Sequence, residues 1–398
     1  MHKVRSWLAN YWELNSLSLM GLIGLFAFLW FRLASITKGF SPSELAVHTQ
    51  LESHTYTILY FWHHLLNAPY TFGLGLIEHF HLDGPLAIRS IGTFFGFLTV
   101  ILFFYLTWRW FGNLVAVLAT VIFADNFWFL LSTRDGTDIS LYGLAVMLMV
   151  ACGLIIRRKS HRNLNILGLV VITAVLIYIP GMIWFLALGA IFQRKHILEE
   201  LKSLSAKYQL LLFIVFLVIV APMLYSIYST PSIAKQLIGL PMNSIGYHQK
   251  ISNFIHYPLS LFINGSYLQG GSIGRLPLLD IFSDVMLALG IYWSFVAHRL
   301  DRTKLIAFGI LLGWILSSLG GDVPTFVTMP FIFLLIAAGI AYLLKQWFSV
   351  FPRNPLARST GTVLVCLAVA SVAFYHYDQY FVAWPHTITT LQTYSRLY

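Results

Sequence analysis

Charge is scarce in this chain of 398 residues, because Asp, Glu, Lys and Arg together fill only 10% of its positions. Hydrophobic residues fill 58% of the positions, and the mean hydropathy is +0.76. A soluble core cannot absorb that much apolar surface, whereas repeated apolar runs of about 20 residues match the ~30 Å hydrocarbon layer of a bilayer. The scarcity of charge therefore excludes an ordinary soluble domain and indicates a polytopic membrane protein.

Alternation of polar and apolar residues is also missing. The apolar runs are continuous, which excludes a transmembrane β-barrel. Cysteine is almost absent, and the two that occur, Cys152 and Cys366, lie inside apolar runs, so neither a disulfide framework nor a metal cluster is predicted. We predict an all-α membrane protein, and the sequence implies no cofactor and no metal.

Apolar runs recur often enough to predict about eleven transmembrane helices in one domain that covers residues 1–398. We expect the second and third spans to meet in a tight turn at Trp108–Trp110. A Pro180-Gly181 pair is expected to divide residues 164–192 into two short spans. The predicted spans are 16–36, 91–111, 113–131, 139–156, the two parts of 164–192, 210–228, 281–297, 305–319, 326–344 and 360–374.

Basic residues gather in a few of the connections between spans, and these set the orientation. With about eleven spans, all these connections fall on the side of the N-terminus, which the positive-inside rule makes cytoplasmic. The net charge of +10 is then a topology signal, and no nucleic-acid partner is expected. We predict a multi-pass protein of the cell membrane whose loops 37–89 and 229–279 and tail 375–398 lie outside. The basic connections are 157–162, 194–207, 298–304 and 345–358.

The first outer loop is where we expect the chemistry, since so long a connection inside a membrane domain is usually functional. Glu44 follows Ser41-Pro42-Ser43, and a helix is predicted to begin near Ser43. Two interpretations of Glu44 stay open: a carboxylate that caps the helix, or a base that deprotonates an acceptor hydroxyl. Glu52 and Glu78 are reserve candidates for that base.

Arginines on the predicted outer side are scarce. Arg89 opens the second span, and Arg134 precedes the fourth, with Asp138 four residues later. Such an arginine either grips a phosphate with two hydrogen bonds or forms a structural ion pair, for which the spacing of Arg134 and Asp138 is suitable. Asp125 lies inside an apolar run, and a carboxylate at that depth predicts a cavity with a partner from another span.

Several motifs occur in an order that one family shares. Ser43-Glu44 falls where that family has Asp-Glu, and the later pieces follow in turn as Ala68–Phe72, Arg89, Arg134 with Asp138, Arg275–Asp280 and Tyr380–Trp384. Together they resemble the integral-membrane glycosyltransferases that use lipid-phosphate sugars. The resemblance is strongest to the GT-C-fold branch of protein O-mannosyltransferases and aminoarabinose transferases.

The resemblance implies an enzyme that moves a mannose-like sugar from a polyprenyl-phosphate carrier to a lipid, glycan or protein acceptor on the extracytoplasmic face, among membrane lipids. It implies a base at Glu44 and substrate-binding roles for Arg89, Arg134, Asp138 and Arg275. The depth of Asp125 in its apolar run makes this residue a further substrate-binding candidate. Ser43 stands where the family has its catalytic Asp, and residues 320–330 lack the family's arginine near the tenth span. A degenerate member that binds a lipid carrier or a partner protein is therefore the alternative. A transporter is disfavoured because the chain has no repeated halves.

Overall fold

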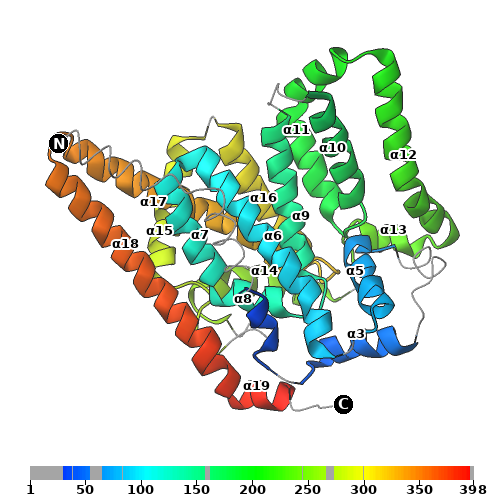
Figure 1. Ribbon diagram of the computed structural model, residues 1–398, viewed down its shortest axis with the longest axis horizontal. Coiled ribbons are helices and arrows are strands. Elements are labelled where there is room, and N and C mark those ends of the chain that lie inside the picture. Colours follow the sequence, from blue (N-terminus) through cyan, green and yellow to red (C-terminus); the bar gives the residue numbers. More distant parts are fainter. Residues whose placement is uncertain are drawn as a thin grey trace.

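The computed structural model describes residues 30–37, 39–53, 65–82, 84–156, 162–243, 245–265, 273–298 and 300–394, without the side chains of residues 52 and 53. These residues form helices and loops only, so the predicted all-α class is confirmed for them (Figure 1). The α-helices are α3 (Pro42–Ser53), α5 (Ala68–His79), α6 (Pro85–Phe111), α7 (Asn113–Asp125), α8 (Phe127–Arg134), α9 (Ile139–Ile155), α10 (Arg162–Leu176), α11 (Met182–Lys202), α12 (Ala206–Ser229), α13 (Ser232–Leu237), α14 (Tyr247–Phe262), α15 (Ile281–Val296), α16 (Asp301–Ser318), α17 (Met329–Val350), α18 (Pro355–Tyr377) and α19 (Ile388–Thr393).

The helices include several that are long and apolar enough to cross a bilayer. There are four of these among the described residues, formed by α6, α12, α17 and α18, and the bent pair α7–α8 makes a fifth if it counts as one span. Helices α9, α10 and α15 are apolar but shorter. The chain is thus a membrane protein, but the predicted count of about eleven spans is not confirmed. The first predicted span, 16–36, lies mostly outside the described residues.

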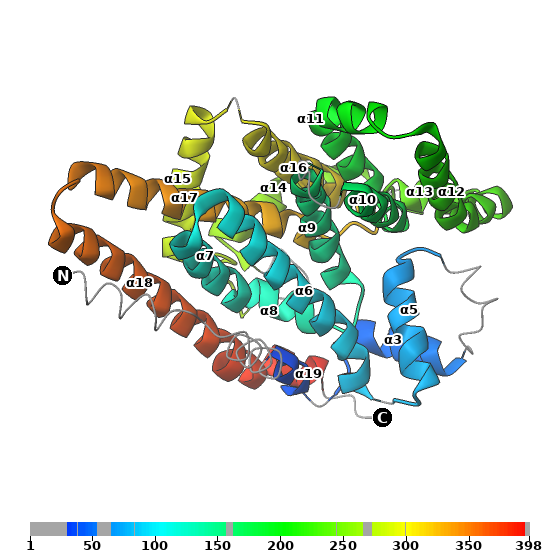
Figure 2. The ribbon, with the colours of Figure 1, turned by 45° about the horizontal axis from the view of Figure 1, so that its top comes forward.

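Helix α17 begins in the middle of the bundle and reaches its edge beside α18, and most of its length is buried against α7, α15 and α16 (Figures 1 and 2). It meets α15 backbone to backbone. A Cβ atom on Gly290 would lie 2.0 Å from the carbonyl oxygen of Leu335, and one on Gly339 would lie 1.9 Å from that of Met286. Glycine permits this approach, which is how helices pack closely in a membrane. Helices α12 and α18, by contrast, are exposed along most of their length.

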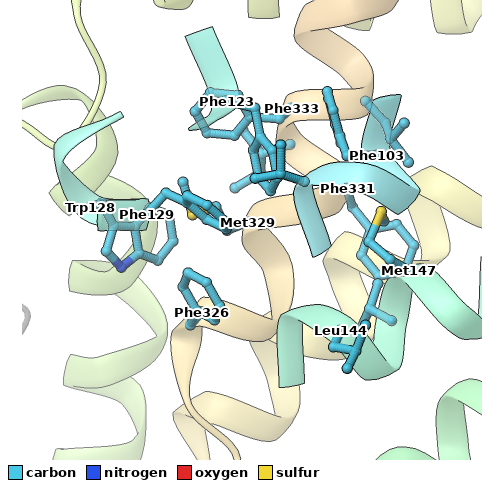
Figure 3. Close-up of a cluster of buried hydrophobic side chains, with 14 of the residues drawn as sticks. Phe103, Phe123, Trp128, Phe129, Leu144, Met147, Phe326, Met329, Phe331 and Phe333 are labelled. Atoms are coloured by element: carbon cyan, nitrogen blue, oxygen red, sulfur yellow. The ribbon is translucent and has the colours of Figure 1, made fainter. Parts of the chain in front are cut away.

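Aromatic rings fill the space between α6, α7, α8 and α17 (Figure 3). The ring centroid of Phe123 lies 4.3 Å from those of both Phe103 and Phe129, and 5.2 Å from that of Phe333. All four rings are fully buried. This packing fixes the short helix α8, and with it the position of Arg134 at its end.

The third predicted span is broken, which the sequence prediction missed. Helix α7 ends at Asp125, α8 begins at Phe127, and the two helices are bent by 59°. Asn126 stands at the bend in an extended conformation, and its side-chain oxygen accepts hydrogen bonds from the backbone N–H groups of Trp128 (3.1 Å) and Phe129 (3.4 Å). An asparagine that caps a helix in this way satisfies donors that the break would otherwise leave unpaired.

Other boundaries are close to those predicted. Helices α10 and α11 are separated at residues 177–181, as the Pro180-Gly181 pair indicated. The turn between α6 and α7 lies instead at Gly112, whose φ of 87° favours glycine, while Trp108–Trp110 stay helical. The first predicted outer loop folds into α3 and α5, and the second carries α13 and α14.

Candidate functional site

The start of α3 is fixed by a pair of reciprocal hydrogen bonds. The backbone N–H of Glu44 donates to Ser41 Oγ (3.1 Å), and the backbone N–H of Ser41 donates to Glu44 Oε2 (2.9 Å). This is the capping box expected of Ser-x-x-Glu. The helix begins at Pro42, one residue before the predicted start, and the interpretation of Glu44 as a capping carboxylate is confirmed.

Glu44 also pairs with Arg89, and both side chains are completely buried. Arg89 Nε donates to Glu44 Oε1 (2.6 Å) and Arg89 Nη2 donates to Oε2 (2.7 Å). Burial alone would raise the pKa of Glu44, but the hydrogen bonds and charge of Arg89 outweigh it and hold that pKa below its ordinary value. Gly136 N–H donates to Oε1 as well (3.2 Å). A carboxylate so occupied is a poor proton acceptor.

The remaining donors of Arg89 bind the chain just before α3. Its Nη1 donates to the carbonyl oxygens of Thr37 (2.6 Å) and Ala34 (3.4 Å), and its Nη2 donates to that of Gly39 (2.5 Å). A guanidinium has five N–H donors, and here each has an acceptor. Arg89 thus has no donor left for a phosphate in this arrangement.

Arg134, at the end of α8, is equally buried but is surrounded differently. Its Nη2 donates to Thr37 Oγ1 (2.5 Å) and its Nη1 to Tyr394 Oη (3.1 Å). The guanidinium carbon lies 4.7 Å from the ring centroid of Trp384 and 4.9 Å from that of Tyr394. Within the described residues its Nε has no acceptor, and no carboxylate lies at ion-pair distance.

The ion pair between Arg134 and Asp138 that their spacing allowed is not formed. Asp138 instead accepts a hydrogen bond from the side-chain amide of Asn67, which precedes α5. Burial and the nearby charge of Asp322 raise the pKa of Asp138 to about 6. The partner of each residue is set by loops that pack from elsewhere in the chain, and not by the local helix spacing.

Asp135, next to Arg134, is the carboxylate that the sequence did not single out. Burial, together with the charge of Glu44, raises its pKa to about 7 despite the opposing charge of Arg134. Its Oδ1 atom is buried without a hydrogen-bond partner among the described residues. A carboxyl group with a pKa near neutrality is suited to accept and release protons, and such groups concentrate at functional sites. In the sequence, only its position directly after Arg134 indicated that Asp135 could belong to a functional site.

Asp135 faces a cavity of about 500 Å³, which we name the α8 cavity. Four distant segments form its wall: the start of α3, α8 with the loop after it, the turn before α17, and the end of the chain. Its lining residues are Ser41, Pro42, Ser43, Trp128, Leu131, Ser132, Asp135, Thr137, Ile139, Pro324, Thr325, Phe326, Thr393 and Tyr394. The cavity combines apolar residues with hydroxyl groups and one carboxyl group, which are polar groups of the kind that fix the orientation of a bound ligand.

Three other predicted site residues, Glu78, Arg275 and Asp125, are not among the residues that line this cavity. Glu78 lines a separate pocket of about 130 Å³ with His48 and His81. Arg275 is exposed in the loop before α15, and Asp125 is half-buried at the end of α7 with its Oδ2 lacking a hydrogen-bond partner in the described structure. The side chain of Glu52 lies outside the described residues. The structure therefore brings Ser43 and Asp135 together near Arg134, and it leaves Glu78, Arg275 and Asp125 outside this cavity.

No protein-family model and no curated protein matches the chain. Solved structures do match. The crystal structure of ArnT from Cupriavidus metallidurans bound to undecaprenyl phosphate gives a TM-score of 0.54 at 16% identity, covering 92% of this chain and 76% of that one. The chain has the ArnT fold. The apo state of ArnT gives a TM-score of 0.53 at 15% identity, with 92% and 75% covered.

ArnT is an aminoarabinose transferase with the GT-C fold, so the resemblance found in the motifs is confirmed for the fold. An identity near 15% carries the fold of ArnT to this chain and nothing finer. The undecaprenyl phosphate is a ligand of ArnT. What this chain binds has to be argued from its own cavity.

Proposed function

We propose that the chain is a GT-C-type membrane glycosyltransferase that moves a sugar from a polyprenyl-phosphate carrier to an acceptor hydroxyl in the α8 cavity. One observation carries the proposal: a carboxyl group with a pKa of about 7, Asp135, stands on the cavity wall beside a buried arginine that has no carboxylate at ion-pair distance among the described residues. A base and a fixed positive charge are what this transfer needs. The undecaprenyl phosphate held by ArnT supports the class of donor.

Tyr394 would bring the charge of Arg134 to the donor phosphate. Its hydroxyl oxygen accepts from Arg134 Nη1, while the residue lines the cavity. A phenol oxygen that accepts one hydrogen bond still has its own O–H to donate. A phosphate in the cavity would receive that hydrogen bond, and the positive charge of the guanidinium behind it would strengthen the interaction in a site of low dielectric constant.

Asp135 would act as the general base, in the role that the sequence resemblance gave to Glu44. The ionised carboxylate takes the proton of the acceptor hydroxyl as its oxygen bonds to the anomeric carbon of the sugar. The bond from that carbon to the phosphate oxygen breaks, and polyprenyl phosphate leaves with the electron pair. Glu44 and Arg89 would position the start of α3, and so Ser43, on the cavity wall.

The finer features of the reaction remain our proposals. They are a mannose-like donor sugar, a lipid, glycan or protein acceptor, and a cell-membrane site that faces the extracytoplasmic side. The orientation can be tested in a chain whose Cys152 and Cys366 are replaced by alanine. A cysteine at the exposed Thr393 should react with an impermeant thiol reagent from outside, and one at the exposed Ser203 only after permeabilisation. The opposite pattern would place the α8 cavity in the cytoplasm.

Transfer assays with purified protein and a panel of polyprenyl-phosphate sugars test the activity. Asp135→Asn keeps the shape of the side chain and removes its basicity, so transfer should fall by about 10²–10⁴-fold. Asp378→Asn, which alters an exposed aspartate outside the cavity, is the matched control and should transfer at the wild-type rate. Equal rates in both variants would remove Asp135 from the mechanism.

A binding protein without catalysis is the second candidate, and Ser43 favours it. This residue lines the cavity, and its hydroxyl is hydrogen-bonded to Ser41 Oγ (2.9 Å) where the family has a carboxylate. If the wild type transfers no sugar but Ser43→Asp does, the site has lost its activity by that one replacement. If neither transfers sugar from any donor, while the wild type binds polyprenyl phosphate, the chain is a lipid-carrier-binding protein.

A further inference from the structure

A second cavity lies at the other end of α9 from the α8 cavity. Ile139, at the N-terminal end of α9, lines the α8 cavity, while Gly153, near the C-terminal end, lines the second one. At 1.5 Å per residue, these two positions are about 20 Å apart. The second cavity has a volume of about 340 Å³ and is enclosed mainly by α9, α10 and α11, which lie together in both views (Figures 1 and 2). We name it the α11 cavity.

The walls of the α11 cavity are apolar almost throughout. Glycines in the wall let α9 and α11 approach each other: a Cβ atom on Gly153 would lie 3.2 Å from the side-chain nitrogen of Gln193, and one on Gly189 would lie 3.2 Å from the sulfur of Met149. Polar lining groups are few, and Gln193 and Glu200 both stand in the C-terminal half of α11. An apolar interior whose one charged lining residue, Glu200, lies toward one end suits an amphiphile with a hydrocarbon chain.

That polar end is also strongly basic. Glu200 is held by Arg162, whose Nε donates to Glu200 Oε2 (2.6 Å) and whose Nη2 donates to the backbone oxygen of Glu200 (3.1 Å). This pair neutralises the acidic group in the cavity wall. The exposed side chains of Arg194, Lys195 and Lys202 then leave an excess of positive charge on the C-terminal half of α11, with Glu199 the only other acidic residue in α11. Basic residues around an apolar space between membrane helices favour an anionic lipid headgroup.

We propose that the α11 cavity binds an acyl chain of an anionic phospholipid, whose headgroup lies against the basic ends of α10 and α11. This site is distinct from the proposed donor site. A polyprenyl carrier with its phosphate at Tyr394 would have that phosphate near the opposite end of α9. A neutral lipid would fill the apolar space but would make no use of the charges around it.

Binding of pyrene-labelled phosphatidylglycerol and phosphatidylcholine to the full-length protein in detergent tests the proposal. Ala190 and Ala187 are both exposed alanines on α11, but only Ala190 lines the cavity. Ala190→Trp should therefore bind phosphatidylglycerol at least tenfold more weakly than the wild type, and Ala187→Trp should bind it equally well. The wild type should bind phosphatidylcholine at least tenfold more weakly than phosphatidylglycerol.

A second variant keeps the test valid if Ala190→Trp fails to fold. The double replacement Arg194→Gln with Lys195→Gln alters exposed side chains only, and it should reduce the affinity for phosphatidylglycerol at least threefold without changing that for phosphatidylcholine. Equal binding of the two lipids by the wild type would overturn the proposal in favour of a site for any lipid tail. So would displacement of the labelled lipid by an equimolar amount of undecaprenyl phosphate, which would mark a carrier site.

Discussion

Arg89 and Arg134 are two completely buried arginines that lie close to the same threonine. Arg89 donates to the backbone oxygen of Thr37, and Arg134 donates to its side-chain hydroxyl. Beyond that, their surroundings differ. Arg89 binds both carboxylate oxygens of Glu44 and three carbonyl oxygens, so its charge and its donors are fully matched. Arg134 has hydroxyls and aromatic rings around it, and a nitrogen with no acceptor in the described structure.

This difference separates a structural charge from one that is available for function. A buried arginine with a bidentate carboxylate is already neutralised, and its removal would leave the carboxylate stranded. A buried arginine held by neutral groups keeps a positive potential that a ligand can use. The same residue type therefore serves the fold on α6 and, by our proposal, the donor phosphate on α8.

The largest expected effect is the loss of stability when Arg89, the arginine paired with Glu44, is replaced. Arg89→Gln should lower the free energy of unfolding by about 3–5 kcal/mol, because it leaves the buried carboxylate of Glu44 without its partner. Thermal unfolding in detergent measures this. The double variant Arg89→Met with Glu44→Leu should lose much less free energy of unfolding than the two single variants lose together. Additive losses would show that the two side chains do not act as a pair.

Asp135 should show a conflict between stability and function. Its pKa is raised from 3.8 to about 7, so protonated Asp135 stabilises the fold below about pH 4, and that contribution is lost as the pH rises through about 7. Asp135→Asn stays neutral, so above pH 8 it should be more stable than the wild type, by up to about 4 kcal/mol. Unfolding temperatures of the variant and the wild type between pH 5 and 9 measure this difference in stability. Both proteins keep Asp138, so its titration contributes equally to both and cancels in the difference. A variant no more stable than the wild type at pH 9 would contradict the assigned burial.

Much of the fold can be predicted from the sequence, because helix positions follow from apolar runs. The break at Pro180-Gly181 and the limits of α9 and α15 were found in that way. The bend at Asn126 was not, since a single capping residue inside an apolar run looks like any polar residue at that depth until the direction of the chain is known. The motifs likewise indicated the GT-C fold, because their order survives where their details have changed.

The candidate site was predicted only in part. Arg134 and the Tyr380–Trp384 motif were noticed separately, and the structure brings them together through the cation–π contact with Trp384. Glu44 was preferred as the base because it keeps the family's motif. Its burial against Arg89 depends on how Ala34, Thr37 and Gly39 pack against Arg89 of α6, which no local pattern encodes. Asp135 differs from Asp138 only in the neighbours that tertiary packing gives it.

The functional side of the comparison is tested by lipid binding. Arg134→Gln should weaken the binding of undecaprenyl phosphate by about 1.5–3 kcal/mol, because it removes the charge behind the phosphate. Its effect on unfolding should be smaller than that of Arg89→Gln, since no carboxylate loses a partner. Arg134→Lys keeps the positive charge but loses the planar guanidinium, so its affinity for undecaprenyl phosphate should lie between those of the wild type and Arg134→Gln. Unchanged affinity in Arg134→Gln would leave Arg134 as a structural residue like Arg89.

The smallest expected effect distinguishes a direct contact from a distant charge. Tyr394→Phe keeps the ring over Arg134 and removes the hydroxyl that we propose donates to the phosphate. Its loss should weaken binding of undecaprenyl phosphate by about 0.5–1.5 kcal/mol, the net value of one neutral hydrogen bond. Because Arg134 acts partly through this hydroxyl, the effects of Tyr394→Phe and Arg134→Gln should be less than additive in the double variant. Additive losses would mean that Arg134 reaches the phosphate by another route. No loss in Tyr394→Phe, together with a loss in Arg134→Gln, would mean that the tail moves aside and Arg134 binds the phosphate itself.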